Sequence, residues 1–289
     1  MLRLGTRGSR LALVQSELVA ERLRRAGHEV ELVPVVTAGD VRPVDTAPGE
    51  GMFVGELAAA LLAGEVDLAV HSAKDLPLEQ DPRLVVAAYP ERADARDALV
   101  TRDGGATLGT LPAGSLIGTD SPRRAGFLLA ARPDLRVGSL HGNVDTRLRR
   151  LDEGQVDALL IAAAGVERLG LAGRIDERLD VEVVAPAPGQ GALAVQVRAD
   201  SAAALAAVGR LDDPEVRLTV ETERRLLGAT GGGCRAPVGA LAELREGTLH
   251  LLAAAVTPEG LDLRLVRIET SPEGAAELAW SVGRKLRPR

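Results

Sequence analysis

The stretch VDLAVHSAKDLP, residues 66–77, joins a run that is apolar except for Asp67 to a compact set of polar side chains. Residues 66–70 are typical of a buried strand, so Lys74 and Asp75 follow shortly after its carboxyl end. Ligands of open α/β sheets bind beside the carboxyl ends of strands. A Lys-Asp pair is often an ordinary surface ion pair, but this position favours a functional role.

The N-terminal segment alternates between strand and helix patterns. Residues 2–4 predict a short strand, and Ser9 is a suitable N-cap for a helix that Gly27 ends. Residues 30–36 predict a second strand, and the alternation as a whole indicates an α/β fold. Residues 42–51 lack an apolar period and contain prolines and glycines, which predicts a loop of the kind that often serves as a lid.

A short internal echo suggests that the chain contains two similar parts. The sequence GEVDLA occupies residues 64–69, and GQVDAL occupies residues 154–159. Each follows a helix-like stretch and leads into a buried-strand pattern. Two similar α/β lobes with a cleft between them would produce this repetition.

The character of the sequence changes from about Asp212. A helix pattern runs to Leu227, and the alternating stretches 249–256 and 261–268 predict antiparallel strands. We therefore expect a smaller α+β domain at the C-terminal end. Cys234 lies near the start of this domain, where it can reach a cleft.

Composition limits the classes of function. The 289 residues suffice for two or three domains. Apolar residues make up 46% of the chain but aromatic residues only 1%, so the cores are built from aliphatic side chains. The net charge of −6 and the scarcity of aromatic rings argue against nucleic-acid binding.

Patterns that the sequence lacks bear on the location of the protein and on metal binding. No signal-peptide pattern and no apolar run of membrane-spanning length is present, so we expect a cytoplasmic protein without a membrane partner. His28, His71, His141 and His250 are scattered without the spacing of metal ligands, so no metal site is predicted.

A second polar cluster, GTDSPRR at residues 118–124, follows the strand-like residues 115–117. Adjacent arginines at a helix start are commonly inert, but here hydroxyls and guanidiniums converge where a helix N-terminus also favours anions. Arg7 stands directly after the first predicted strand, Arg147 follows GNVDT at 142–146, and Arg168 lies in GVERLG at 165–170. Arginine forks bind carboxylates bidentately, so this set predicts a substrate with many carboxylates.

Cys234 is the only cysteine of the chain and follows three glycines, residues 231–233. A single thiol cannot form an internal disulfide or a cysteine metal cluster. A lone cysteine is often a small buried hydrophobic residue. The glycines, however, permit positive φ and leave the backbone unshielded, so a bulky group could approach or be attached to the sulfur.

Six motifs occur together and in the order found in the porphobilinogen deaminase family, also called hydroxymethylbilane synthases, which this chain resembles. They are GTRGS at 5–9, HSAKDLP at 71–77, GTDSPRR at 118–124, GNVDTR at 142–147, GQGA at 189–192 and GGC at 232–234. The resemblance runs from residue 2 to about residue 239, and the motifs are jointly very specific.

The resemblance implies a fold class and a domain organisation. It implies an α/β protein of two periplasmic-binding-protein-like (type II) lobes with mixed sheets, plus a smaller α+β C-terminal domain. We expect domain 1 to comprise residues 1–92 and 192–210, domain 2 residues 97–187, and domain 3, which carries the cofactor cysteine, residues 213–289. The resemblance also favours a monomer.

The resemblance implies a transferase that joins four porphobilinogen molecules head to tail with loss of ammonia. The product would be the linear tetrapyrrole hydroxymethylbilane of porphyrin and haem biosynthesis. A dipyrromethane cofactor would be held by a thioether to Cys234. The catalytic aspartate falls on Asp75, whose carboxylate can stabilise the positive charge that develops in the reaction and can exchange protons.

The carried-over binding residues fall into two groups. The resemblance assigns cofactor binding, besides Cys234, to Ser72, Lys74, Thr119, Ser121, Arg123 and Arg124. It assigns binding of porphobilinogen and the growing chain to Arg7, Ser9, Phe53, Asn143, Arg147, Arg168 and Gln190.

Two departures from the family pattern remove positive charge. The family usually has a lysine where Glu50 stands and an arginine where His141 stands. An imidazole carries a charge only when protonated, so we expect weakened chain elongation. Two alternatives remain: a catalytically impaired relative that still binds pyrroles, and a two-lobed binding protein for small anions. The latter would need neither Cys234 nor the pair Lys74 and Asp75.

Overall fold

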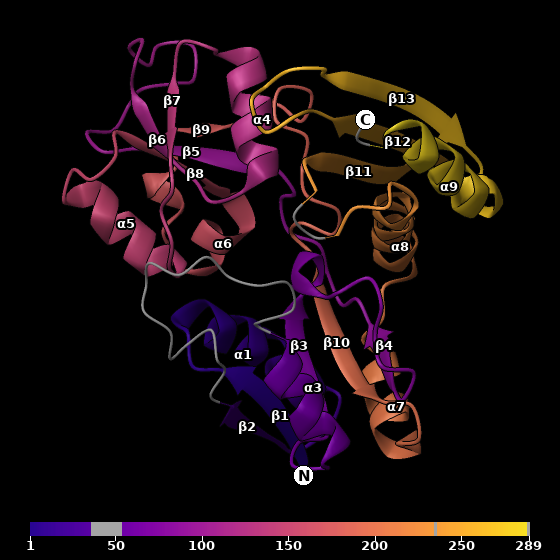
Figure 1. Ribbon diagram of the computed structural model, residues 1–289. Helices are drawn as coiled ribbons and strands as arrows, with labels where there is room; N and C mark the ends of the chain where they lie inside the picture. The colour runs from indigo at the N-terminus through magenta and orange to yellow at the C-terminus, as the bar shows by residue number, and fades with distance from the viewer. Residues whose placement is uncertain (36–53, 234–235, 288–289) are drawn as a thin grey trace. The chain divides into compact units, whose positions relative to one another are not determined.

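The computed structural model describes residues 1–35, 54–233 and 236–287, which divide into two compact units (Figure 1). Among the described residues, unit 1 contains 1–35, 54–93 and 192–217, and unit 2 contains 94–191 and 218–287 without 234–235. The predicted lid, residues 42–51, lies outside the described residues, as do Phe53 and Cys234.

Unit 1 is built on a mixed five-stranded sheet of order β2-β1-β3-β10-β4. Its strands are β1 (Leu2–Arg7), β2 (Val30–Val35), β3 (Leu68–Ser72), β4 (Leu84–Ala88) and β10 (Leu193–Arg198). Its helices are α1 (Arg10–Arg25), α3 (Gly55–Leu62) and α7 (Ala202–Gly209). β1 runs parallel to β2 and β3, whereas β10 runs antiparallel to β3 and β4.

Successive side chains of β3 point to opposite faces of the sheet, and both faces are covered by helices. Leu68 and Val70 pack in one apolar cluster with residues of α1 and α7, and Ala69 packs in another with residues of α3. The predicted cap of α1 is confirmed, because the Ser9 hydroxyl accepts a hydrogen bond from the Ala12 N–H. Gly27, with a φ of 90°, follows the end of this helix.

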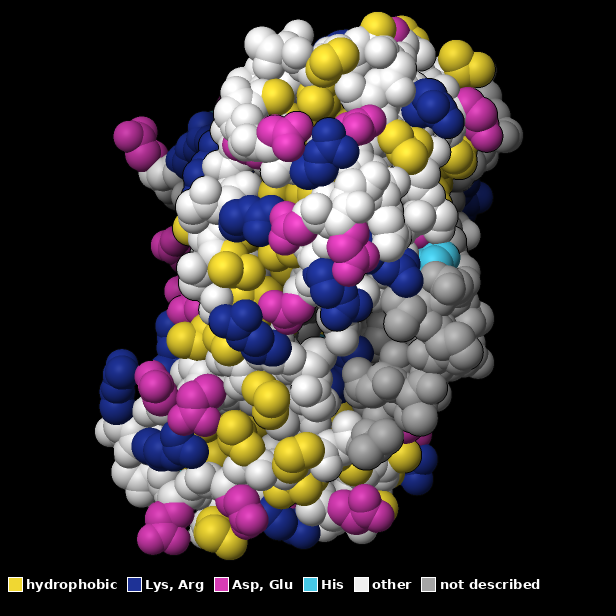
Figure 2. Space-filling model, turned by 90° about the vertical axis from the view of Figure 1, so that its left-hand side faces the viewer, with side chains coloured by type: hydrophobic (Ala, Val, Ile, Leu, Met, Phe, Trp, Pro, Cys, Tyr) yellow, Lys and Arg dark blue, Asp and Glu magenta, His cyan; other side chains and the backbone are white. Residues whose placement is uncertain are grey.

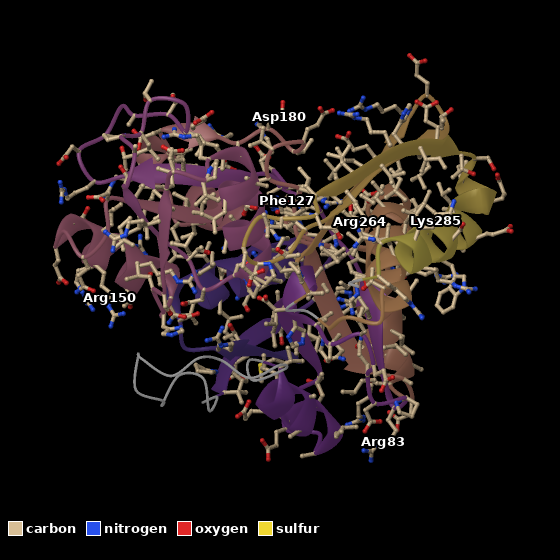
Figure 3. All side chains as sticks on the ribbon, turned by 45° about the horizontal axis from the view of Figure 1, so that its top comes forward. Arg83, Phe127, Arg150, Asp180, Arg264 and Lys285 are labelled. Atoms are coloured by element: carbon tan, nitrogen blue, oxygen red, sulfur yellow. The ribbon has the colours of Figure 1, made fainter. Side chains whose placement is uncertain are left out.

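Unit 2 contains a second mixed five-stranded sheet, of order β7-β6-β8-β5-β9. Its strands are β5 (Asp97–Thr101), β6 (Leu116–Gly118), β7 (Arg136–Gly138), β8 (Ala158–Ala162) and β9 (Glu177–Arg178). Its helices include α4 (Pro122–Ala131), α5 (Val144–Asp152) and α6 (Ala163–Arg168). Leu160 of β8 packs in one core cluster with Phe127 of α4, which Figure 3 labels.

The two sheets repeat one topology. In each, three parallel strands are followed by an antiparallel fourth strand and a fifth strand antiparallel to the fourth. The echoed segments lead into β3 and β8, which are the third strands. Asp67 accepts a hydrogen bond from the Arg3 N–H at 2.8 Å, and Asp157 accepts one from the Leu116 N–H at 2.8 Å. The expectation of two similar α/β lobes with mixed sheets is thus confirmed.

The C-terminal part of unit 2 is an α+β arrangement, as expected. Its elements are α8 (Pro214–Ala229), which begins in unit 1, β11 (Val238–Arg245), β12 (Thr248–Ala255), β13 (Arg264–Thr270) and α9 (Ala275–Lys285). The strands form an antiparallel sheet of order β11-β12-β13. The short 3-10 helices of the chain are η1 (Ala73–Asp75), η2 (Ala172–Arg174) and η3 (Pro272–Gly274).

The strand predicted over 261–268 begins later than expected, at Arg264. Asp262 has a φ of 53°, which is incompatible with a strand, and Leu261 is exposed. The Arg264 guanidinium instead donates to the carbonyl oxygens of Lys285 and Leu286 at 3.0 and 3.4 Å, at the end of α9 (Figure 3). The boundaries proposed for three separate domains stay a prediction.

None of the helices in the described parts of the chain is both long and apolar enough to cross a membrane.

Candidate active site

Asp75 ends η1, the turn that directly follows β3. Its side chain is exposed, whereas Lys74 is half-buried and the flanking Ala73 and Leu76 are fully buried. The Ala73 N–H donates to the carbonyl oxygen of Ala192 at 3.0 Å, which ties the turn to the strand region beside it. The fold therefore presents an accessible carboxylate on an anchored backbone, the placement that a catalytic group requires.

His71 lies in β3 and is buried, with 5% of its surface exposed. Burial lowers the pKa of His71 to about 4; a hydrogen bond with Gln196 opposes this shift, and the charge of Arg7 adds to it. His71 is therefore neutral at neutral pH and adds no positive charge for binding anions.

The other candidate residues of unit 1 lie at the ends of β1 and β3. Arg7 is the last residue of β1, Ser9 is the N-cap of α1, and Ser72 is the last residue of β3. The Ser72 hydroxyl accepts a hydrogen bond from the Gln15 side chain at 3.1 Å. Because β1 and β3 are neighbouring parallel strands, their carboxyl ends bring these residues to the same edge of the sheet as Asp75.

In unit 2, a comparable edge carries Thr119, Ser121, Asn143 and Arg147. Ser121 caps α4, because its hydroxyl accepts from the Arg124 N–H at 3.4 Å. The Thr119 hydroxyl in turn accepts from the Ser121 N–H at 3.3 Å. Asn143 stands at the N-cap of α5, and its carbonyl accepts from the Arg147 N–H at 3.0 Å. The loops that follow β6 and β7, and the first turn of α5, therefore hold these polar groups.

Arg123, Arg124 and Gln190 meet around a buried carboxylate, that of Asp97. Asp97 is fully buried, with Oδ2 2.7 Å from Arg123 Nη1 and Oδ1 accepting from Arg124 Nε at 2.8 Å. Gln190 Nε2 donates to Asp97 Oδ1 at 3.0 Å. Burial lowers the pKa of Arg123, and the charge of Asp97 opposes that shift. One carboxylate balances only one of the two guanidinium charges, so the cluster favours an anion nearby.

Two more contacts hold the segment around Gln190 in place. Arg168, the last residue of α6, donates from Nη2 to the carbonyl oxygen of Gly191 at 2.7 Å. The buried Glu223 of α8 accepts from the Gly189 N–H and from the Ala242 N–H, each at 2.7 Å. Residues 189–191 are therefore fixed from both sides, and Glu223 links them to the C-terminal sheet.

The cysteine segment is described up to Gly233 and again from Ala236. Gly231 has a φ of 74°, a conformation that favours glycine. At Gly232 a Cβ atom would lie 2.5 Å from the Ala236 Cβ, so a side chain cannot be accommodated there without movement. The Ala236 N–H donates to the Gly233 carbonyl at 2.9 Å. The glycines thus satisfy local backbone requirements.

Sequence reasoning missed three polar residues of these edges: Gln15, Asp97 and Asp120. Asp97 begins a fully buried strand and is followed by three apolar residues, and a charge in that position signals a buried partner. Asp120 stands inside the quoted motif GTDSPRR. For Gln15 the sequence carries no signal, because only the fold brings it to Ser72. Within the described ranges, no three His, Cys, Asp or Glu side chains are grouped to hold a metal ion.

Comparison with solved structures finds a distant likeness. A nutrient binding protein from Burkholderia cenocepacia bound to methionine is 17% identical, with a TM-score of 0.47 over 75% of this chain and 93% of that chain.

Family models match most of the sequence. Residues 2–206 match "Porphobilinogen deaminase, dipyromethane cofactor binding domain", and residues 217–288 match "Porphobilinogen deaminase, C-terminal domain". The porphobilinogen deaminase of Acidothermus cellulolyticus is 47% identical over 293 residues, which cover 99% of this chain and 87% of that protein. The one of Roseiflexus sp. is 48% identical over 269 residues, covering 91% and 88%. The chain therefore belongs to the porphobilinogen deaminase family.

Proposed function

We propose that the chain is a working hydroxymethylbilane synthase (EC 2.5.1.61), a transferase that condenses four porphobilinogen molecules head to tail with loss of ammonia. Its product is hydroxymethylbilane, a linear tetrapyrrole. The observation that carries this proposal beyond family membership is the exposed carboxylate of Asp75 on the anchored turn after β3. An anion held in this way can stabilise the positive charge that ammonia loss and pyrrole attack create.

The polar edges of the two units are suited to pyrroles that bear acetate and propionate groups. Unit 1 supplies Arg7, Ser9, Ser72 and Lys74, and unit 2 supplies Thr119, Ser121, Arg123, Arg124, Asn143, Arg147, Arg168 and Gln190. Guanidinium and hydroxyl donors bind carboxylates through charge-assisted hydrogen bonds. Arg123, Arg124 and Gln190 act through their buried cluster with Asp97, which adds positive charge to the edge that Thr119 and Ser121 form.

A dipyrromethane cofactor on Cys234 fits the donor set of this chain. The residues assigned to it include arginines, a lysine and hydroxyls but no carboxylate, and three glycines, residues 231–233, precede the cysteine in the sequence. When bound, the cofactor supplies the pyrrole to which the first substrate pyrrole is joined. The chain's own residues hold its carboxylates, and Asp75 is available for proton exchange.

The remaining features of this proposal concern the cellular form of the protein. We expect a cytoplasmic monomer of three domains, 1–92 with 192–210, 97–187 and 213–289, without nucleic-acid partners. On the face shown in Figure 2, basic and acidic side chains are interspersed, which supports the absence of polyanion binding there.

Two alternatives are kept because specific residues favour them. Glu50 and His141 stand where the family usually has cations, so an impaired relative that only binds pyrroles is the main rival. A two-lobed small-anion binding protein is the second, since it would share the arginine-bearing strand ends.

The decisive experiment is the intact mass of the denatured protein before and after brief exposure to porphobilinogen, with C234S as a control. A stable two-pyrrole increment that requires Cys234, followed by one-pyrrole steps, supports the proposed function. An unmodified mass that substrate does not change supports a binding protein. An increment that never grows supports the impaired relative.

A further inference from the structure

Asp120 places an acidic side chain inside the anion-binding motif, between Thr119 and Ser121. Asp120 is the second residue after the end of β6, and its side chain is only 11% exposed. Solvent therefore screens its charge weakly, and its neighbours experience that charge strongly.

The two oxygen atoms of Asp120 have different surroundings. Oδ1 accepts hydrogen bonds from the Ser139 hydroxyl at 2.6 Å and from the Leu140 N–H at 3.0 Å. Oδ2 lies 2.8 Å from His141 Nδ1 and 3.7 Å from Arg147 Nη2. Neutral donors thus fix one oxygen, and the other oxygen is directed at two basic residues.

The Ser139 hydroxyl completes this arrangement, because it lies 3.0 Å from His141 Nε2. Both ring nitrogens of His141 therefore lie near oxygen atoms. Asp120 holds the ring on one side and Ser139 holds it on the other. Asp120 Oδ2 and His141 Nδ1 are thus close enough for an ion pair, although neither atom makes a hydrogen bond within the described residues.

The internal repeat shows that this acid is not a requirement of the fold. Gly5 of β1 and Gly118 of β6 are equivalent, since a Cβ on either would contact Val66 or Val156 of the echoed segments. A threonine follows each glycine, and the next residue is Arg7 in unit 1 but Asp120 in unit 2. The second residue after these equivalent glycines thus carries opposite charges in the two units.

We infer that Asp120 is an internal counter-ion that limits the affinity of unit 2 for carboxylate ligands. Its Oδ2 occupies the side of His141 and Arg147 that a pyrrole acetate or propionate would use, and it repels an incoming carboxylate. A ligand carboxylate that reaches His141 and Arg147 must therefore compete with Asp120. This inference rests on the proposed function for the nature of the ligand.

The test compares D120N and D120S with the parent holoenzyme. D120N keeps an oxygen acceptor for the Leu140 N–H and removes the charge. D152N is the matched control, because Asp152 carries the same charge change in unit 2 and pairs with Arg174 at 2.6 Å on an exposed surface. Citrate serves as a tricarboxylate probe whose binding is followed by calorimetry, and porphobilinogen turnover gives KM and kcat separately.

We expect both Asp120 variants to bind citrate about two- to fivefold more tightly and to lower KM by a similar factor, the scale of a partly screened charge contact. The kcat of both Asp120 variants should stay within about twofold of the parent value. D152N should match the parent in citrate affinity and KM, because a local effect does not extend to a distant exposed charge. Unchanged citrate affinity in both Asp120 variants, or an equal gain in D152N, overturns the inference. A lost kcat with unchanged KM also overturns it, because Asp120 would then only hold the loop.

The citrate measurement keeps the two hypotheses apart. If the parent enzyme does not turn over porphobilinogen, the proposed function fails, yet tighter citrate binding by D120N still supports the counter-ion role of Asp120.

Discussion

Asp97 and Arg123 form a buried ion pair, with Asp97 Oδ2 2.7 Å from Arg123 Nη1 and their side chains 0% and 5% exposed. Arg124 shares the same carboxylate, and Gln190 donates to it. Three residues assigned to ligand binding are therefore held in position by one acidic residue that begins β5. The same cluster therefore contributes to the stability of unit 2 and holds the candidate anion-binding residues in position.

Replacement of Asp97 by asparagine should strongly destabilise the protein. It leaves two buried guanidiniums without their counter-charge, and breaking a buried pair typically costs about 3–5 kcal/mol. Urea denaturation followed by circular dichroism measures the loss. D152N, which removes a carboxylate from an exposed pair, should cost less than about 1 kcal/mol. Equal losses in the two variants would contradict a stabilising role for the buried pair.

His71 should make the folded state less stable in mild acid. Its pKa is about 4 in the folded protein against an ordinary value of 6.5, so between these values the unfolded chain binds a proton that the folded chain does not. Stability therefore falls as pH decreases from 6.5 to 4, by up to about 3 kcal/mol. Denaturation of the parent and of H71Q at a series of pH values isolates this contribution. Parallel pH profiles for the two proteins would refute it.

Gly126 should tolerate no side chain. A Cβ at this position of α4 would lie 2.3 Å from the carbonyl oxygen of Thr257, between the second lobe and the C-terminal sheet of unit 2. G126A should lose about 1–3 kcal/mol of stability through overpacking. Gly209, at the end of α7, has open space around its Cβ position, so G209A should be neutral or slightly stabilising. Thermal unfolding of both variants tests this contrast.

Local patterns sufficed to predict several elements of the two lobes. The Ser9 cap and Gly27 placed α1, and the apolar run before His71 placed β3 within two residues. The echo at residues 64–69 and 154–159 indicated the repeated topology before any contact was known. Such features are visible because each depends on neighbours in sequence.

Long-range features could not be predicted in the same way. β10 inserts between β3 and β4 from more than a hundred residues away, and Asp97 meets Gln190 across a similar separation. The predicted strand begins at Leu261, whereas β13 begins at Arg264. The alternation of apolar and polar residues extends back to Leu261, but the backbone at Asp262 does not permit a strand. The apolar runs of the sequence sufficed to place the candidate residues at strand ends. Their partners Gln15, Asp97 and Asp120 could not be identified, because only tertiary contacts bring them close.

Restoring the family's cations should raise activity, and Asp120 should limit the gain at position 141. H141R supplies a permanent charge, but Asp120 Oδ2 lies 2.8 Å from His141 Nδ1 and would pair with the new guanidinium. We therefore expect H141R to raise kcat/KM by less than about twofold and H141R combined with D120S to raise it by about five- to tenfold, since the guanidinium would then face the substrate carboxylate. E50K, outside the described residues, should give a separate gain. Initial rates across porphobilinogen concentrations test these values, and no gain in any of the three variants would reject the view that lost charge weakens elongation.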